Sequence, residues 1–148
     1  MAAPKGNKFW EARYNTGRKP KIKTATELWN ASIKYFEWVE ANPLWETKVG
    51  FFQGEAFDHP VAKMRAPTLQ GLWIFLGISK DTWYNYKNRK GFLEVITRVE
   101  HVLFDMKFAG AAAELFNPNI IARDLKLTEH TDITSDGEKL EGLRVEHV

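Results

Sequence analysis

The chain has 148 residues, including ten Phe, six Trp and four Tyr, so a single domain with a substantial apolar core is expected. The absence of cysteine excludes disulfides and thiolate metal sites, and it favours a reducing cytosol. No apolar run reaches the roughly 18 residues that a membrane span needs, and neither a span nor a secretory signal is expected.

The net charge is only +2, but it is unevenly distributed along the chain. Seven basic residues and one acidic residue give residues 1–23 a balance of +6, whereas 14 basic and 18 acidic residues give residues 24–148 a balance of −4. A basic arm indicates a polyanionic partner, and a merely solvated terminus is the alternative. The basic residues of the arm are Lys5, Lys8, Arg13, Arg18, Lys19, Lys21 and Lys23.

The pattern from Thr24 onward predicts a helix. Thr24 and Glu27 have the spacing of a capping box, and Asn42 followed by Pro43 ends the pattern. Apolar residues recur between these ends with a helical period. They are Leu28, Trp29, Ile33, Phe36 and Val39.

Residues 45–65 change to a β pattern. β-forming residues lie on either side of Gln53 and Gly54, which predicts a hairpin turn there. Pro60 either restricts the second strand to a sheet edge or breaks it. Because an isolated hairpin is marginal in water, we expect this one to lie on the helices or on another copy of the chain.

Residues 68–88 have the spacing of a helix-turn-helix. Thr68 and Ser79 can each cap a short helix, and Gly77 can end the first one in a left-handed conformation. Two interpretations stay open: a DNA-reading unit, or a helical hairpin that only packs, which Trp73 favours because such crossings usually take a small residue there. The residues predicted to face a DNA groove are Lys80, Tyr84, Asn85 and Lys87.

A long helix is predicted from Phe92 to Phe116. A stripe with three- and four-residue steps runs to Met106, and beyond it a second apolar side appears next to small residues. A helix that is apolar on two sides must be covered twice, by self-association or by burial within one domain. The predicted oligomer interface comprises Phe104, Phe108, Ala109, Gly110, Ala112, Ala113, Leu115 and Phe116.

A last short helix is predicted after Asn117, because Pro118 suits its first position. From Thr128 the chain is polar and acidic, although residues 142–148 alternate weakly and suit a strand if copies assemble. The predicted organisation is therefore a basic arm (1–23), a helical core (24–127) with a β-hairpin near 45–65, and an acidic tail (128–148). The fold class is mainly α, combining a helix-turn-helix-like hairpin, a β-hairpin insertion and a long oligomerisation helix.

The sequence contains few motifs that are typical of enzymes. No glycine-rich phosphate loop precedes a Lys and Ser/Thr pair, the four histidines lack ligand spacing, and no carboxylate cluster of a Mg²⁺ nuclease is evident. Asp58 and His59 are interpreted as an ordinary surface pair. We therefore expect no enzyme, no cofactor and no metal site.

Four stretches resemble the small terminase subunit, the DNA-packaging protein of headful-packaging tailed bacteriophages. They are Ala2 to Arg13 (AAPKGNKFWEAR), Tyr35 to Leu44 (YFEWVEANPL), Lys63 to Leu72 (KMRAPTLQGL) and Phe108 to Leu127 (FAGAAAELFNPNIIARDLKL). The tail from Thr128 lacks the basic character with which some relatives bind DNA.

The resemblance implies a non-enzymatic protein of the host cell cytoplasm that forms a closed homo-oligomeric ring, of about nine copies. Such a ring would bind the packaging-initiation site on double-stranded, concatemeric phage DNA, and would recruit and regulate the large terminase subunit with its ATPase and nuclease activities. The arm would supply phosphate contacts, and residues 80–87 would read bases. The alternatives are a dimeric helix-turn-helix transcription regulator and a structural assembly protein that binds no DNA.

Overall fold

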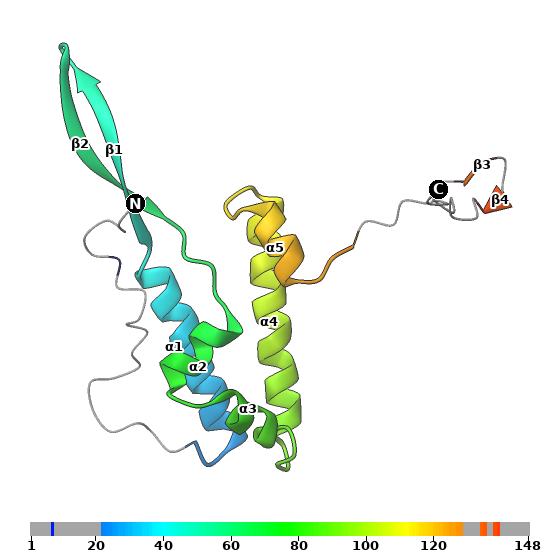
Figure 1. Ribbon diagram of the computed structural model, residues 1–148. Helices are drawn as coiled ribbons and strands as arrows, with labels where there is room; N and C mark the ends of the chain where they lie inside the picture. The colour runs from blue at the N-terminus through cyan, green and yellow to red at the C-terminus, as the bar shows by residue number, and fades with distance from the viewer. Residues whose placement is uncertain (1–6, 8–21, 129–133, 136–137, 140–148) are drawn as a thin grey trace, which may run out of the picture.

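A helical body and a long β-hairpin that projects from it form the molecule (Figure 1). The computed structural model describes Asn7 and residues 22–128, 134–135 and 138–139. The fold class is mainly α, as predicted. The elements are α1 (Ala25–Ala41), β1 (Leu44–Phe52), β2 (Glu55–Lys63), α2 (Leu69–Leu76), α3 (Lys80–Tyr86), α4 (Phe92–Ala112), α5 (Pro118–Asp124), β3 (Thr134–Ser135) and β4 (Glu138–Lys139).

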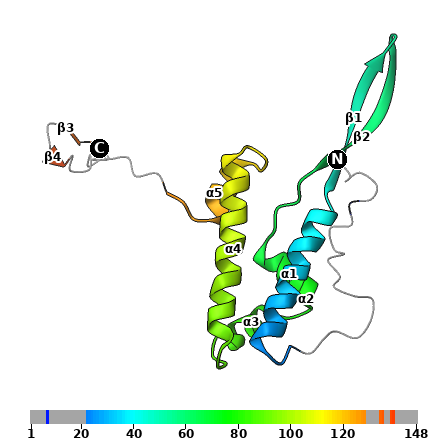
Figure 2. The same cartoon turned by 180° about the vertical axis from the view of Figure 1, so that it is seen from behind.

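The body is organised around α1 and α4. α1 contacts α2 and α4, α3 contacts α4, and both views of the molecule show α1 and α4 with the short helices α2 and α3 near one end (Figures 1 and 2). The core lies between them, where Leu28, Leu72, Trp83, Ile96 and Val99 are fully buried. Of the stripe predicted for α1, Leu28 and Val39 are buried, whereas Trp29, Ile33 and Phe36 are half-buried. The predicted capping box is present at the start of α1, where the Glu27 amide donates to Thr24 Oγ1 over 3.2 Å.

Tyr35 ties α2 to α1. Its hydroxyl donates to the Thr68 carbonyl and accepts from the Thr68 amide, each over 3.1 Å, and burial raises the pKa of the Tyr35 hydroxyl. A side chain at position 71 would collide with that hydroxyl, which explains the glycine there. The start of α2 is therefore fixed by a contact with a residue far away in the sequence.

The hairpin is a regular two-stranded ladder with the predicted turn. Phe52 pairs with Glu55 across Gln53 and Gly54, whose φ angles of 50° and 84° suit a tight hairpin turn. Asn7 bonds both backbone groups of Trp45 with its side-chain amide, over 2.8 and 3.0 Å, so those groups point away from β2. Two residues further on, Thr47 has the same orientation and pairs with Pro60.

Pro60 consequently stands where the partner strand requires no donor, and its missing N–H group falls on the outer edge of β2. Of the two alternatives predicted for this proline, the edge strand is the one observed, since β2 continues unbroken to Lys63.

The long helix α4 ends at Ala112, four residues earlier than predicted. Glu114 adopts a positive φ of 59°, and the amides of Leu115 and Phe116 both donate to the Gly110 carbonyl, over 2.9 and 3.1 Å. Phe116 thereby folds back onto Gly110, where any side chain would collide with its ring. The helix ends through this packing contact, which a helical period cannot reveal.

α5 then returns along the end of α4. Asn117 caps it by accepting from the Ile120 amide, and Pro118 occupies its first position, as predicted. Lys107 of α4 and Asp124 of α5 form an ion pair of 2.5 Å. The predicted strand at 142–148 and the arm, apart from Asn7, Ile22 and Lys23, lie outside the described residues.

Candidate nucleic-acid and assembly surfaces

The α2–α3 pair has the local chemistry of a helix-turn-helix. Thr68 and Ser79 cap the two helices by accepting from the Gly71 and Thr82 amides, over 2.9 and 3.1 Å. Gly77 has a left-handed φ of 66°, and a turn of three residues joins the helices. Trp73 is half-buried at this crossing. The pair therefore has the predicted connection, although both helices are short.

Glu100 of α4 anchors α3. Its Oε1 atom accepts from the indole Nε1 of Trp83 over 3.1 Å and lies 3.1 Å from Nζ of Lys87. Trp83 is completely buried beneath this contact. One carboxylate therefore fixes both the buried and the exposed side of α3.

The outer face of α3 carries cations around an exposed tyrosine. Lys80 and Lys87 lie 5.7 and 5.0 Å from the ring centroid of Tyr84, and Asn85 is exposed next to them. The structure thus brings together the four residues predicted for groove contact. We call this group the α3 face.

Two further cations follow the α3 face directly, and neither was predicted from the sequence as a DNA contact. Arg89 packs over the rings of Tyr86 and Phe92 at 5.5 and 4.7 Å, and Lys90 is exposed beside it. The run of basic residues from Lys87 to Lys90 is the sequence signal that could have identified them. Of the predicted arm cations, only Lys23 lies in the described region, where it is exposed.

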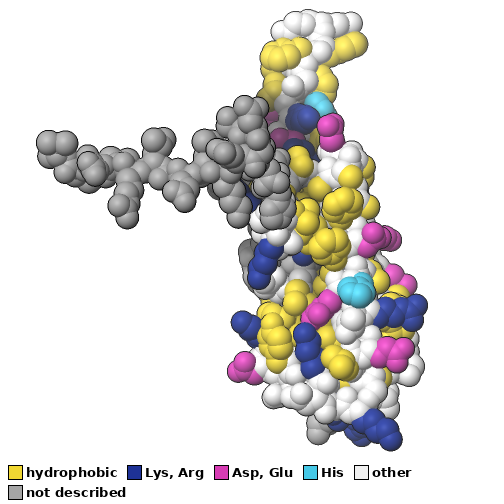
Figure 3. Space-filling view, turned by 90° about the vertical axis from the view of Figure 1, so that its right-hand side faces the viewer, with side chains coloured by type: hydrophobic (Ala, Val, Ile, Leu, Met, Phe, Trp, Pro, Cys, Tyr) yellow, Lys and Arg dark blue, Asp and Glu magenta, His cyan; other side chains and the backbone are white. Residues whose placement is uncertain are grey.

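The outer side of α4 is apolar instead. Phe104 and Phe108 are 44% and 49% exposed, and their rings stack with centroids 6.3 Å apart and planes at 6°. We call these two residues the aromatic pair. Figure 3 shows hydrophobic side chains along this side of the molecule.

The other predicted interface residues divide into three groups. Ala109, Ala112, Ala113 and Leu115 are exposed, Phe116 is half-buried, and Gly110 is buried. The missing side chain of Gly110 serves a contact with Phe116 of the same chain. An interface with another copy remains a prediction for all of them.

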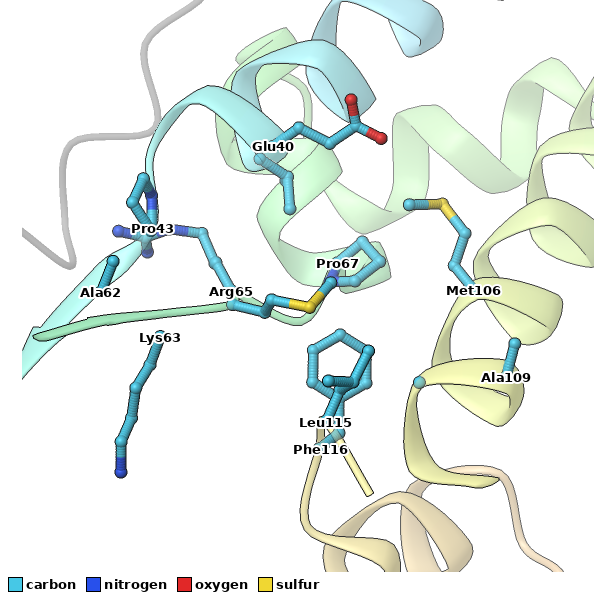
Figure 4. Close-up of a pocket in the computed structure, with 13 residues that line it drawn as sticks. Glu40, Pro43, Ala62, Lys63, Arg65, Pro67, Met106, Ala109, Leu115 and Phe116 are labelled. Atoms are coloured by element: carbon cyan, nitrogen blue, oxygen red, sulfur yellow. The ribbon is translucent and has the colours of Figure 1, made fainter. Parts of the chain in front are cut away.

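A pocket of about 560 Å³ opens on the opposite side of α4, between the end of α1, the segment after β2 and the end of α4 (Figure 4). We call it the α1–α4 pocket. Sequence reasoning missed it because it joins residues far apart in the chain. Its lining comprises Val39, Glu40, Pro43, Ala62, Lys63, Met64, Arg65, Pro67, Met106, Ala109, Gly110, Leu115 and Phe116.

The described residues include no group of three His, Asp or Glu side chains placed to hold a metal ion. Asp58 and His59 are adjacent in β2 and therefore point to opposite faces of the hairpin. In the part of the chain that the structure describes, no helix combines the length and apolarity needed to cross a membrane.

Comparison with known proteins places these surfaces in a family. The family model of the DNA-packaging protein gp3 matches residues 17–133. The chain belongs to the DNA-packaging protein gp3 family. Over 139 residues it is 55% identical to the terminase small subunit of Salmonella phage P22, covering 92% of this chain and 86% of that protein. The resemblance to phage small terminase subunits is confirmed.

The gp3 family match includes every element from α1 to α5. The α3 face, the aromatic pair and the α1–α4 pocket all lie within it. The matched region therefore contains both a basic and an apolar surface on one helical body.

Proposed function

We propose that this member of the gp3 family is a non-catalytic packaging subunit that acts in the host cell cytoplasm. It assembles into a closed ring of about nine copies, binds the packaging-initiation site on concatemeric phage DNA, and recruits and regulates the large terminase ATPase and nuclease. The observation that supports this most is the separation of two surfaces on one helical body. α3 presents cations, whereas α4 presents exposed aromatic rings.

DNA binding divides into two contributions under this proposal. The arm cations neutralise phosphates and supply affinity that falls with salt but reads no sequence. Lys80, Asn85 and Lys87 make contacts to base edges, with Tyr84 beside them. In a ring each contribution is multiplied by the number of copies, so each arm needs only weak affinity.

Salt titration of DNA binding separates the two contributions. Neutralising the arm, by changing Lys5, Lys8, Arg13, Arg18, Lys19, Lys21 and Lys23 to Gln, should weaken binding to all sequences and flatten the dependence of log affinity on log salt. Changing Lys80, Asn85 and Lys87 to Ala should mainly reduce discrimination between the packaging site and random DNA. An arm variant that binds as tightly as the natural chain would overturn the first assignment, and an unchanged footprint would overturn the second.

The acidic tail, residues 128–148, is the segment that we assign to the large subunit. A polar, acidic segment with few large apolar residues can fold on a partner at some cost in affinity. A chain truncated before residue 128 should keep its ring and its DNA affinity but no longer stimulate the large subunit's ATPase. Full stimulation by the truncated ring would place that contact elsewhere.

A dimeric transcription regulator is the second candidate, because the caps and turn of α2 and α3 fit one. It predicts a two-fold dimer and a palindromic DNA site. Native mass spectrometry without DNA distinguishes them: one closed species of about eight to eleven copies supports the ring, and a dimer supports the regulator. An assembly protein without DNA contact would form the ring yet bind no DNA at low salt.

A further inference from the structure

α4 carries two different apolar features at one level along its axis. Phe104 and Phe108 are four residues apart and share one side of the helix. Met106 is midway between them, and two residues turn an α-helix by about 200°. Met106 therefore points away from the aromatic pair and lines the α1–α4 pocket together with Ala109 (Figure 4).

Within the part of the chain that the structure describes, the aromatic pair is only partly covered. Both rings keep nearly half of their surface exposed although they stack on each other. Exposed aromatic rings of this kind are typical anchors at protein interfaces. Two stacked, half-exposed rings on one side of a helix can insert into an apolar hollow of a partner.

The α1–α4 pocket is such a hollow. Its volume of about 560 Å³ falls within the range of about 300–1,000 Å³ typical of binding cavities. The side chains of Val39, Pro67, Met106 and Leu115 make its lining mainly apolar.

The two cations at the pocket's edge are held by their own chain. Lys63 pairs with Glu46 over 2.8 Å, and Arg65 donates from Nε to the Asn42 carbonyl over 2.8 Å. The guanidinium of Arg65 also lies over the Trp38 ring at 5.1 Å. An apolar occupant can therefore enter without displacing a free charge at either position.

We propose that the aromatic pair of one copy packs into the α1–α4 pocket of the next copy. This inference rests on the proposed ring and assigns its contact. The two features face opposite sides of α4 at the same level, so successive copies are related by rotation with little rise along the helix. Such a heterologous contact gives a ring when the rotation between copies closes, and little rise favours closure, whereas a two-fold dimer would bring identical surfaces together.

A second copy is the occupant that the structure favours, because one helix supplies both complementary features. The same contact accounts for the small residue at position 109. Ala109 forms part of the pocket wall, and a larger side chain there would fill the space that the incoming rings need.

Two variants, each defective on one side, test the contact. Phe104→Asp with Phe108→Asp removes the aromatic pair and leaves the pocket intact, while Ala109→Arg fills the pocket and leaves the pair intact. Native mass spectrometry should find each variant alone as a monomer. An equimolar mixture should give a heterodimer with one copy of each, because a single intact contact remains and neither free end can extend.

Ile74→Asp is the matched control, since Ile74 is a large apolar side chain with similar exposure, 56%, on α2 and belongs to neither surface. It should assemble like the natural chain. Far-UV circular dichroism and thermal unfolding check that each variant folds. As milder variants, Phe108→Ala and Leu115→Ala should each raise the concentration at which the assembly dissociates by about tenfold.

The outcomes separate this inference from the proposed function. A natural chain that stays monomeric or forms only a dimer overturns the ring, and the contact with it. A natural chain that forms a ring, together with a folded aromatic-pair variant that also forms one, overturns the contact alone. Folded variants whose mixture stays monomeric overturn the heterologous pairing.

Discussion

The helical body and the β-hairpin are both rich in large apolar residues, but they place them differently. In the body, Leu28, Trp83 and Ile96 have no exposed surface, whereas Phe51 and Phe52 near the hairpin tip are 77% and 67% exposed. The body therefore gains hydrophobic stabilisation within one chain, and the hairpin depends on its ladder and its turn. The number of apolar residues alone does not show which of them are buried in the core and which are exposed on the surface.

Removing one large side chain from each region should give the largest contrast. Trp83→Ala should lower the free energy of unfolding by about 3–5 kcal/mol, because it empties the core and leaves Glu100 without its indole donor. Phe51→Ala should change it by less than about 0.5 kcal/mol. Urea unfolding of dilute protein, followed by far-UV circular dichroism, measures both. Comparable losses would mean that the hairpin tip packs within the single chain.

Two glycines that lie under aromatic rings sharpen the comparison. Gly110→Ala should cost about 1–3 kcal/mol, because Phe116 is held in place over it by the returning chain. Gly50→Ala should cost much less, since Phe57 above it is 49% exposed and its ring can move aside. Thermal unfolding of the two variants tests this order. A larger loss at position 50 would show that the hairpin is rigidly packed.

Threonine substitutions compare the helical body with the hairpin through smaller changes in the free energy of unfolding. Thr68→Ala should destabilise the protein by about 1 kcal/mol, because the Gly71 amide loses its capping acceptor. Thr47→Ala in β1 should stay within about 0.5 kcal/mol. Urea unfolding midpoints at constant slope give the two values. Equal losses would mean that the capping hydrogen bond of Thr68 adds no more stability than a non-capping threonine side chain on the hairpin.

The smallest effect concerns two carboxylates whose pKa values are both lowered. Backbone amides of Lys23 and Thr24 lower the pKa of Glu27, and a hydrogen bond from Lys63 lowers that of Glu46. A folded-state pKa below the unfolded one gives stability that is present above the unfolded value and is lost as the pH falls through the folded value.

Glu27→Gln should therefore reduce the loss of stability on acidification below about pH 5, and Glu46→Gln should reduce it to a smaller extent, because the partner of Glu46 is one exposed Lys side chain and not two backbone amides. Urea unfolding of α1, monitored at 222 nm across this pH range, provides the measurement, with the natural chain as reference. A steeper acid dependence of the Glu27 variant would contradict the assignment.

Signals confined to a few neighbouring residues predicted local structure well. The capping box at Thr24, the turn at Gln53 and Gly54, and the left-handed Gly77 are all observed where the sequence indicated them. Each depends on backbone chemistry that is complete within about four residues. The family resemblance was confirmed as well: its four stretches lie between residues 2 and 127, and the family model matches residues 17–133.

Features that need distant residues were not predictable in this way. The end of α4 depends on Phe116 returning to Gly110, so the helical period overran it by four residues. The α1–α4 pocket brings Val39 next to Met64 and Met106, and no local pattern connects these three. The residues of the α3 face were correctly predicted to lie together, because all of them lie on or directly after one short helix. Their role in DNA binding stays a prediction.

The unbroken ladder of the hairpin has a consequence for how its length can change. Every residue from Leu44 to Phe52 has a partner between Glu55 and Lys63, and neighbouring residues face opposite sides. Deleting one residue from a single strand would turn every side chain beyond that point to the other face. Deleting a cross-strand pair would shorten the hairpin and keep its faces. Natural variation in this segment should therefore come in matched pairs, and the hairpin should lengthen or shorten by whole rungs.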